Sequence, residues 1–172
     1  MSNFRFIFLL LFISCSTSKV ITDYDAKEDF SKFKTFDFYE DNGENLNELD
    51  VNRISDIIFN KLIETGFLQN SAPDFFIFFD TNTAEAQNNN SIGIGVGSGG
   101  RNGGIGISGG IPIGGKKLNE ELIIKFIEAK TNDLFWEGSL NSVIKEKRTP
   151  EQKELHLKEV VQKILKEFPP KG

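Results

Sequence analysis

The chain has 172 residues, of which 38% are hydrophobic and 26% charged, and this composition suits one folded domain. The net charge of −5 argues against nucleic-acid binding, because a protein needs a basic face to meet phosphates. One Cys and one His exclude an intrachain disulfide, a multi-cysteine zinc site and a multi-histidine metal site, so we expect no metal or cofactor.

The first fourteen residues have the layout of an export signal. Arg5 and the α-amino group give a short positive region, and an apolar run over 6–13 follows. Spanning a membrane takes about 20 apolar residues, so this run suits a signal peptide instead. Ser14 then precedes Cys15, as in bacterial lipoprotein signals, where the thiol receives a diacylglycerol and the signal is cut before the cysteine. Such signals prefer Leu where this chain has Phe12.

We therefore expect residues 1–14 to be a signal peptide cut between Ser14 and Cys15, and residues 15–19 to be a lipid-anchored tether. Acyl chains on Cys15 would anchor the chain firmly, at about 0.8 kcal/mol per buried CH₂ group. The alternative is an uncleaved apolar segment that happens to contain the cysteine. We expect the anchor to lie in the outer membrane of a bacterial envelope, and the lack of an acidic run after Cys15 favours its periplasmic face over export to the cell surface.

The domain expected over residues 20–170 begins with two strands and a helix. Residues 20–25 have strand composition, and residues 34–40 alternate between apolar and polar side chains. Residues 48–65 place apolar side chains at helical spacing, with Asn47 as the N-cap and Gly66 as the stop.

Three further strands are predicted after this helix. Residues 74–80 hold five consecutive apolar residues, which indicates a strand in the middle of a sheet. Residues 117–130 and 133–145 alternate as a hairpin around a two-residue turn at Thr131 and Asn132. On the second of these strands, one face should carry Leu134, Trp136, Gly138 and Leu140.

A second helix is predicted from Pro150 onwards. Thr149 and Gln152 form a capping-box pattern around this proline, and Pro169-Pro170 ends the helix. The order is strand, strand, helix, strand, glycine-rich hairpin, strand, strand, helix. We therefore expect an α+β fold, a mostly antiparallel sheet with two helices packed on one face.

A glycine-rich insertion over 91–116 interrupts the predicted sheet. Residues 93–115 hold 12 of the 16 glycines, which alternate in places with Ile and Val. We expect either a loosely held hairpin or an aliphatic edge that pairs with a partner strand or touches the membrane. Gly95–Gly100 matches G-x-G-x-x-G, but the residues that follow cannot open a helix, so we expect no nucleotide site.

Few residues offer catalytic chemistry, and we predict no catalytic, metal or cofactor residue. His156 should lie on the second helix beside its apolar stripe, as a residue of the surface or of the border between buried and exposed faces. Trp136 and most Phe residues should form the core, with an exposed ligand platform as the alternative for Trp136. No two acidic residues can be placed at a glycosidase separation, and we expect strand-end or surface positions for Asp23, Asp25, Asp37, Asp74 and Asp80.

Residues 20–25, followed by 29–36 (Asp-Phe-Ser-Lys-Phe-Lys-Thr-Phe), resemble the opening of the bacterial lipoproteins grouped as domain of unknown function 4136 (DUF4136). In that family a Tyr-Asp strand precedes a motif like F-x-x-Y/F-K-T-F. The glycine-rich middle fits as well, as do Gly66-Phe67, Pro73-Asp74, Leu134–Gly138 and Phe168–Pro170. The resemblance covers essentially residues 20–170. It implies an exported, lipid-anchored α+β domain, and it carries over no catalytic residues.

These observations predict a membrane-anchored envelope lipoprotein that acts as a non-enzymatic binding or structural module. Its expected partners are the membrane, through the lipid on Cys15, and an envelope protein or glycan, but no nucleic acid. One alternative is a hydrolase of cell-envelope polymers, which carboxylates gathered in one cleft would favour. The other is a surface ligand-binding module, which a solvent-accessible aromatic platform would favour.

Overall fold

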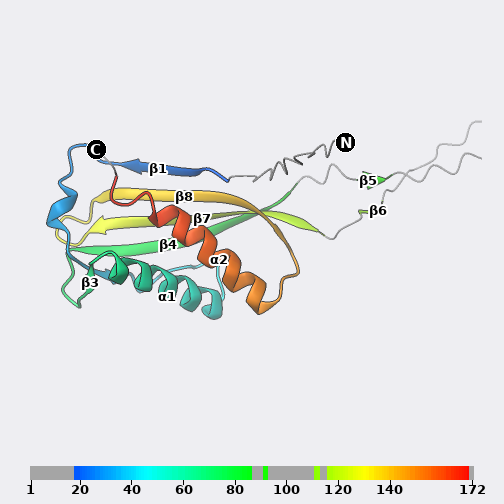
Figure 1. Ribbon diagram of the computed structural model, residues 1–172, viewed down its shortest axis with the longest axis horizontal. Coiled ribbons are helices and arrows are strands. Elements are labelled where there is room, and N and C mark those ends of the chain that lie inside the picture. The colour runs from blue at the N-terminus through cyan, green and yellow to red at the C-terminus, as the bar shows by residue number, and fades with distance from the viewer. Residues whose placement is uncertain (1–17, 87–90, 93–110, 113–115, 171–172) are drawn as a thin grey trace, which may run out of the picture.

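The computed structural model describes residues 18–86, 91–92, 111–112 and 116–170. A six-stranded sheet lies behind two helices (Figure 1). The elements are β1 (Val20–Tyr24), the 3₁₀ helix η1 (Phe30–Lys32), β2 (Thr35–Phe38), α1 (Glu48–Glu64), β3 (Leu68–Gln69), β4 (Phe75–Glu85), β5 (Ser91–Ile92), β6 (Ile111–Pro112), β7 (Lys117–Glu128), β8 (Leu134–Lys145) and α2 (Pro150–Leu165).

The strand order in the sheet is β1-β8-β7-β4-β2-β3. The pairs β1–β8, β8–β7 and β7–β4 are antiparallel, whereas β2 runs parallel to both β4 and β3. The predicted α+β class, the element order and the mostly antiparallel sheet are therefore confirmed. The strand predicted over 74–80 does lie in the middle of the sheet, between β7 and β2, and β4 continues to Glu85.

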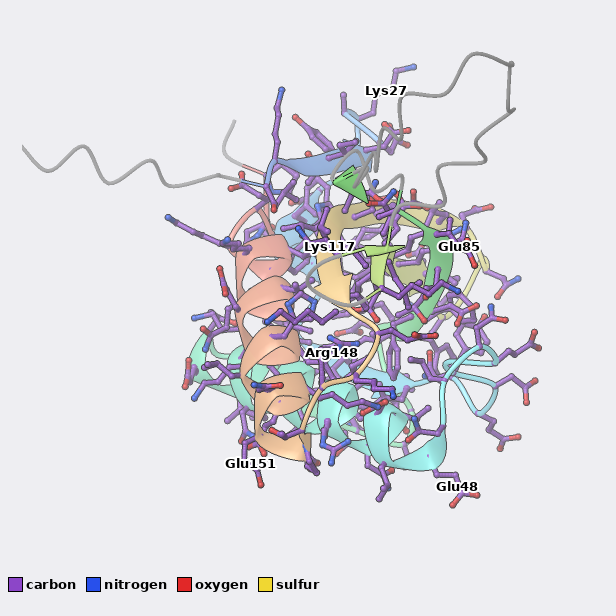
Figure 2. All side chains as sticks on the ribbon, turned by 90° about the vertical axis from the view of Figure 1, so that its right-hand side faces the viewer. Lys27, Glu48, Glu85, Lys117, Arg148 and Glu151 are labelled. Carbon is purple, nitrogen blue, oxygen red and sulfur yellow. The ribbon has the colours of Figure 1, made fainter. Side chains whose placement is uncertain are left out.

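The predicted helix caps are present. The Asn47 side chain accepts a hydrogen bond from the Asp50 backbone N–H at 3.1 Å, and Gly66 has a φ of 96° just after α1. Thr149 and Gln152 form the reciprocal capping box at the start of α2. Both helices begin at the end of the molecule that faces the viewer in Figure 2, where Glu48 and Glu151 are labelled. Neither α1 nor α2, the α-helices of the described residues, is long and apolar enough to cross a membrane.

The core lies between the helices and the sheet and combines aliphatic side chains with a cluster of aromatic rings. Trp136 is fully buried, with its ring centroid 4.8 Å from that of Phe126 and 5.2 Å from that of Phe168. Phe33 stacks on Phe135 at 4.0 Å. The prediction that Trp136 belongs to the core is thus confirmed, and with it the core assignment of Phe36, Phe75, Phe79 and Phe126.

A β-bulge changes the predicted face of β8. Phe126 on β7 pairs with Trp136, but the next residue, Ile127, pairs with Leu134, so Phe135 is the extra residue. Phe135 and Trp136 are therefore both buried, and the Leu134 side chain is 49% exposed. The prediction that Leu134 shares the face of Trp136 was wrong, because strict alternation stops at a bulge.

The connection between β7 and β8 is longer than the predicted two-residue turn. β7 ends at Glu128 and β8 begins at Leu134, and Asn132 has a left-handed φ of 61°. Its backbone N–H donates to the Glu128 carbonyl at 2.9 Å. Within the glycine-rich insertion, β5 and β6 form a short antiparallel pair. The other residues of that expected hairpin lie outside the described residues, as do Ser14 and Cys15.

Candidate functional site: a cleft beside the free end of β8

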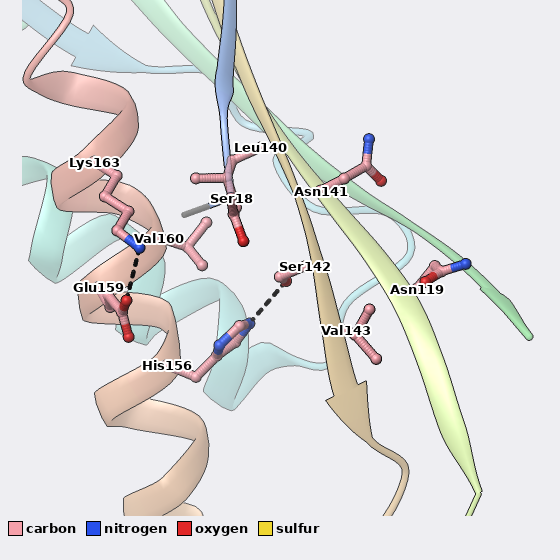
Figure 3. Close-up of a pocket in the computed structure, with 10 residues that line it drawn as sticks. All are labelled: Ser18, Asn119, Leu140, Asn141, Ser142, Val143, His156, Glu159, Val160 and Lys163. Atoms are coloured by element: carbon pink, nitrogen blue, oxygen red, sulfur yellow. Dashed lines mark hydrogen bonds and ion pairs between the residues drawn. The ribbon is translucent and has the colours of Figure 1, made fainter. Parts of the chain in front are cut away.

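The cleft arises because β1 is shorter than its partner strand. Val20, the first residue of β1, pairs with Leu140, whereas β8 continues to Lys145. Among the described residues, nothing pairs with the outer edge of β8 beyond Leu140. Helix α2 runs beside this free end, so a hollow lies between the strand edge and the helix (Figure 3).

The cleft has a volume of about 550 Å³ and is open to solvent. Aliphatic side chains and neutral hydrogen-bonding groups dominate its lining, and its one acidic residue, Glu159, is paired with Lys163 at 2.7 Å. The full lining is Ser18, Asn119, Leu140, Asn141, Ser142, Val143, His156, Glu159, Val160 and Lys163. Such a surface suits a neutral polar ligand or an extended peptide more than a charged small molecule.

His156 faces β8 and contacts both Ser142 and Glu120. Its Nε2 atom lies 3.2 Å from Ser142 Oγ and 3.2 Å from Glu120 Oε1. A catalytic triad needs the serine on one ring nitrogen and the carboxylate on the other. Here both groups meet the same nitrogen, which has either one proton or one lone pair to offer. Ser142 Oγ also lies 3.2 Å from the Glu120 carbonyl oxygen, to which it can donate. This arrangement holds the His156 ring in place and does not activate Ser142.

Glu120 connects the cleft to a cluster of charges beneath it. Its carboxylate accepts from Arg148 Nη2 at 3.1 Å, and the two side chains are 12% and 14% exposed. Burial raises the pKa of Glu120, but the hydrogen bond from His156 and the charge of Arg148 outweigh it, so the pKa lies below its usual value. Glu120 is therefore a carboxylate at neutral pH.

A second ion pair lies beside the first, between the starts of α1 and α2. Asp50 accepts from Arg53 Nη1 at 2.6 Å and from Lys153 Nζ at 2.9 Å. Burial opposes these contacts, yet the hydrogen bonds from Lys153, Asn47 and Arg53 lower the pKa of Asp50. The Nε and Nη1 atoms of Arg148 are buried and have no hydrogen-bond partner among the described residues. This cluster joins the two helix starts to β7 and is structural in its contacts.

The structure places the five candidate aspartates apart or at the surface. Asp74 accepts from the backbone N–H groups of Lys34 and Thr35, both at 2.9 Å, and the first of these is the main cause of its lowered pKa. Asp37 accepts from Gln69, and Asp80 from Asn45.

Asp23 and Asp25 do come together with Glu137 at a shallow hollow of about 270 Å³ between β1 and β8. Both aspartates are exposed and accept from nearby backbone N–H groups, those of Tyr24 and Lys27, at 2.9 Å. Within the described part of the chain, no group of three or more His, Cys, Asp or Glu side chains is arranged to hold a metal ion.

The sequence predicted that His156 lies on the second helix beside the apolar stripe, and α2 does carry it. It did not predict the contacts with Ser142 and Glu120 or the link through Glu120 to Arg148, because these residues come from two strands and the segment before α2. The local signal for these contacts was a polar residue on the apolar face of a strand. Glu120 stands at such a position on β7, and Ser142 does so on β8.

The described residues form an α+β domain in which two helices cover one face of a six-stranded sheet. The chain belongs to the family described as a domain of unknown function (DUF4136), whose model matches residues 20–170. The expected family is thus confirmed. No curated protein matches this sequence.

Solved structures of similar fold include those of the two proteins that follow. A PDZ domain protein from Parabacteroides distasonis ATCC 8503 matches with a TM-score of 0.59 and 17% identity, over 90% of this chain and 36% of that one. Two structures of PelC from Paraburkholderia phytofirmans, described as dodecamers, match with TM-scores of 0.50 and identities of 8% and 7%. They cover 87% of this chain and 95% of theirs. At these identities the likeness shows the fold alone. This chain spans about a third of the length of the PDZ domain protein.

Proposed function

We propose that this chain is a lipid-anchored, non-enzymatic binding or structural module of the bacterial cell envelope. It is held through Cys15 in the outer membrane and faces the periplasm. The observation that carries this proposal is the apolar run over 6–13 that ends at Ser14 and Cys15, five positions before the first strand. Because β1 is an edge strand and starts at Val20, cutting the chain before Cys15 removes no part of the described sheet.

We propose that the cleft beside β8 is where an envelope protein or glycan docks. Neutral side chains and a free strand edge offer hydrogen bonds to either partner, and Leu140, Val143 and Val160 provide an apolar base. Trp136 has no part in this, because a fully buried indole cannot serve as a ligand platform. The hydrolase alternative would have to use the carboxylates of the shallow hollow, the exposed Asp23 and Asp25 and the half-buried Glu137.

Replacing Cys15 tests the anchor. In cells fed labelled fatty acid, Cys15→Ser should abolish lipid labelling and either release the protein into the soluble fraction or leave the precursor uncleaved. Ser16→Ala is the control, because it alters the neighbouring residue and keeps the thiol. A Cys15→Ser protein that is still processed and membrane-bound contradicts the proposal.

Photo-crosslinking in intact cells tests the cleft. A crosslinking amino acid at Val143, which is 64% exposed in the cleft, should give discrete products with an envelope protein or glycan. Leu68 is a matched control, since it is 62% exposed and lies on β3 at the other edge of the sheet. Equal products from both positions, or none from Val143, would count against docking in this cleft.

A further inference from the structure

At one end of the domain, β4 and β8 end and β7 begins. Glu85 on β4 pairs with Leu118, and Lys117 pairs with Lys145 at the end of β8. The backbone N–H of Glu146 donates to the Lys116 carbonyl at 2.9 Å, so the pairing of β7 with β8 extends one residue beyond each strand. We call Glu85, Lys116, Lys117, Lys145, Glu146 and Lys147 the strand tip. Figure 2 looks onto this end, with Glu85 and Lys117 labelled.

The two described residues before β1 lie on the strand-tip side of Val20. β1 is antiparallel to β8 and Val20 pairs with Leu140, so Ser18 and Lys19 precede Val20 on the side of Lys145. Ser18 lines the cleft together with Asn141 and Ser142, which agrees with this direction.

The number of residues between Cys15 and β1 sets how far the lipid anchor can lie from the sheet. Cys15 stands five residues before Val20, and Lys145 stands five residues after Leu140. Five extended residues reach about 17 Å, and five residues of an antiparallel strand cover about the same length. An acylated Cys15 can therefore reach the level of the strand tip.

The charges of the strand tip suit a lipid surface. The strand tip has four exposed lysines and two exposed glutamates, so its net charge is positive. Lys117 and Lys145 lie directly opposite each other on β7 and β8. Like charges in such a cross-strand pair are unfavourable, and a layer of anionic headgroups would relieve the repulsion. The acidic starts of the helices, marked by Glu48 and Glu151, lie on the side of this end away from β1 (Figure 2).

We infer that the domain stands on the membrane with its strand tip against anionic lipid headgroups, and this inference rests on the proposed anchor at Cys15. Ala86 and Lys116, where the glycine-rich sequence leaves and rejoins the sheet, are then next to the lipid. The opposite end of the β7–β8 hairpin, with Lys130, points away from the bilayer.

Two lysines on one strand hairpin provide the test. Lys117 is on the strand tip, and Lys130 lies in the turn at the other end of the twelve-residue β7, about 40 Å away. Both are exposed, so Lys117→Cys and Lys130→Cys are matched variants. Acylation occupies Cys15 in the full-length processed protein, and the introduced thiol is then the one that takes a fluorescent label. The proteins are reconstituted in vesicles of phosphatidylethanolamine and phosphatidylglycerol that carry a headgroup nitroxide quencher.

The expected result is several-fold stronger quenching of the label at position 117 than at position 130. Equal quenching, or stronger quenching at position 130, in a protein whose Cys15 carries acyl groups by mass spectrometry would overturn the orientation and leave the anchor intact. A processed chain without acyl groups would refute the anchor, and the orientation with it.

Discussion

The indole ring of Trp136 fills the space above Gly138 on the same face of β8. A Cβ atom on Gly138 would lie 2.6 Å from Trp136 Cη2 and 2.7 Å from Ile164 Cγ2. The missing side chain therefore lets the tryptophan ring and α2 approach the strand closely. Any larger residue at position 138 comes too close to both of them.

Gly138→Ala should destabilise the fold by about 1–3 kcal/mol, the usual cost of inserting a methyl group into a filled core. The free energy of unfolding in urea measures this, and the emission of the only tryptophan follows the transition. If the steric conflict is with the indole, Gly138→Ala should cost less in a Trp136→Phe background, followed there by circular dichroism. An equal cost in both backgrounds would place the conflict with Ile164 alone.

Glu120→Gln should destabilise the protein at neutral pH by about 3 kcal/mol, because it leaves the Arg148 guanidinium buried without its counter-charge. The pKa of Glu120 is lowered in the folded state, so its contribution is complete above the ordinary glutamate pKa and is lost as the pH falls through the folded-state pKa. The difference between wild type and variant should therefore shrink in acid. Urea titrations at several pH values measure it.

Glu121→Gln is the control for this change. Glu121 is the next residue of β7, so its side chain lies on the opposite face of the sheet, where it accepts from Asn141 at 3.3 Å. A loss of stability as large as that of Glu120→Gln would show that the buried pair with Arg148 is not the cause.

Thr149→Ala should cost about 1 kcal/mol, because it removes the side-chain acceptor for the Gln152 backbone N–H at the start of α2. Thr149→Ser keeps the hydroxyl group and should be close to wild type. Thermal unfolding of the three proteins ranks them. A Thr149→Ser variant as unstable as Thr149→Ala would point to the methyl group and not to the cap.

Residues 87–116 should be replaceable by Asn-Gly without loss of the fold. The backbone N–H of Ala86 donates to the Lys117 carbonyl at 3.1 Å, so these two residues already have the pairing that a two-residue hairpin turn needs. Closing a shorter loop is entropically easier, and the free energy of unfolding should stay within about 1 kcal/mol of wild type. A drop of several kcal/mol would show that the glycine-rich insertion supports the sheet.

The sequence by itself determined the features whose interacting groups are close along the chain. Asn47 reaches a backbone N–H three residues away, and Thr149 and Gln152 satisfy each other across the same spacing. Gly66 supplies a left-handed φ that other residues adopt with strain. The alternation of β7 likewise depends only on the two-residue period of a strand. These signals predicted both α-helices, five of the six strands of the sheet and most of the core.

Only the tertiary structure decided the rest, because those features depend on residues far apart in the chain. The bulge at Phe135 buries a ring against Phe33, about a hundred positions earlier, and no local pattern records that stacking. The parallel pairing of β2 with β4 follows from the path of the chain through α1. The cleft exists because β1 stops opposite Leu140 while β8 continues, and α2 brings His156 to that free edge. Where a strand ends relative to its partner is set by packing over the whole sheet, so residue types along one strand cannot reveal it.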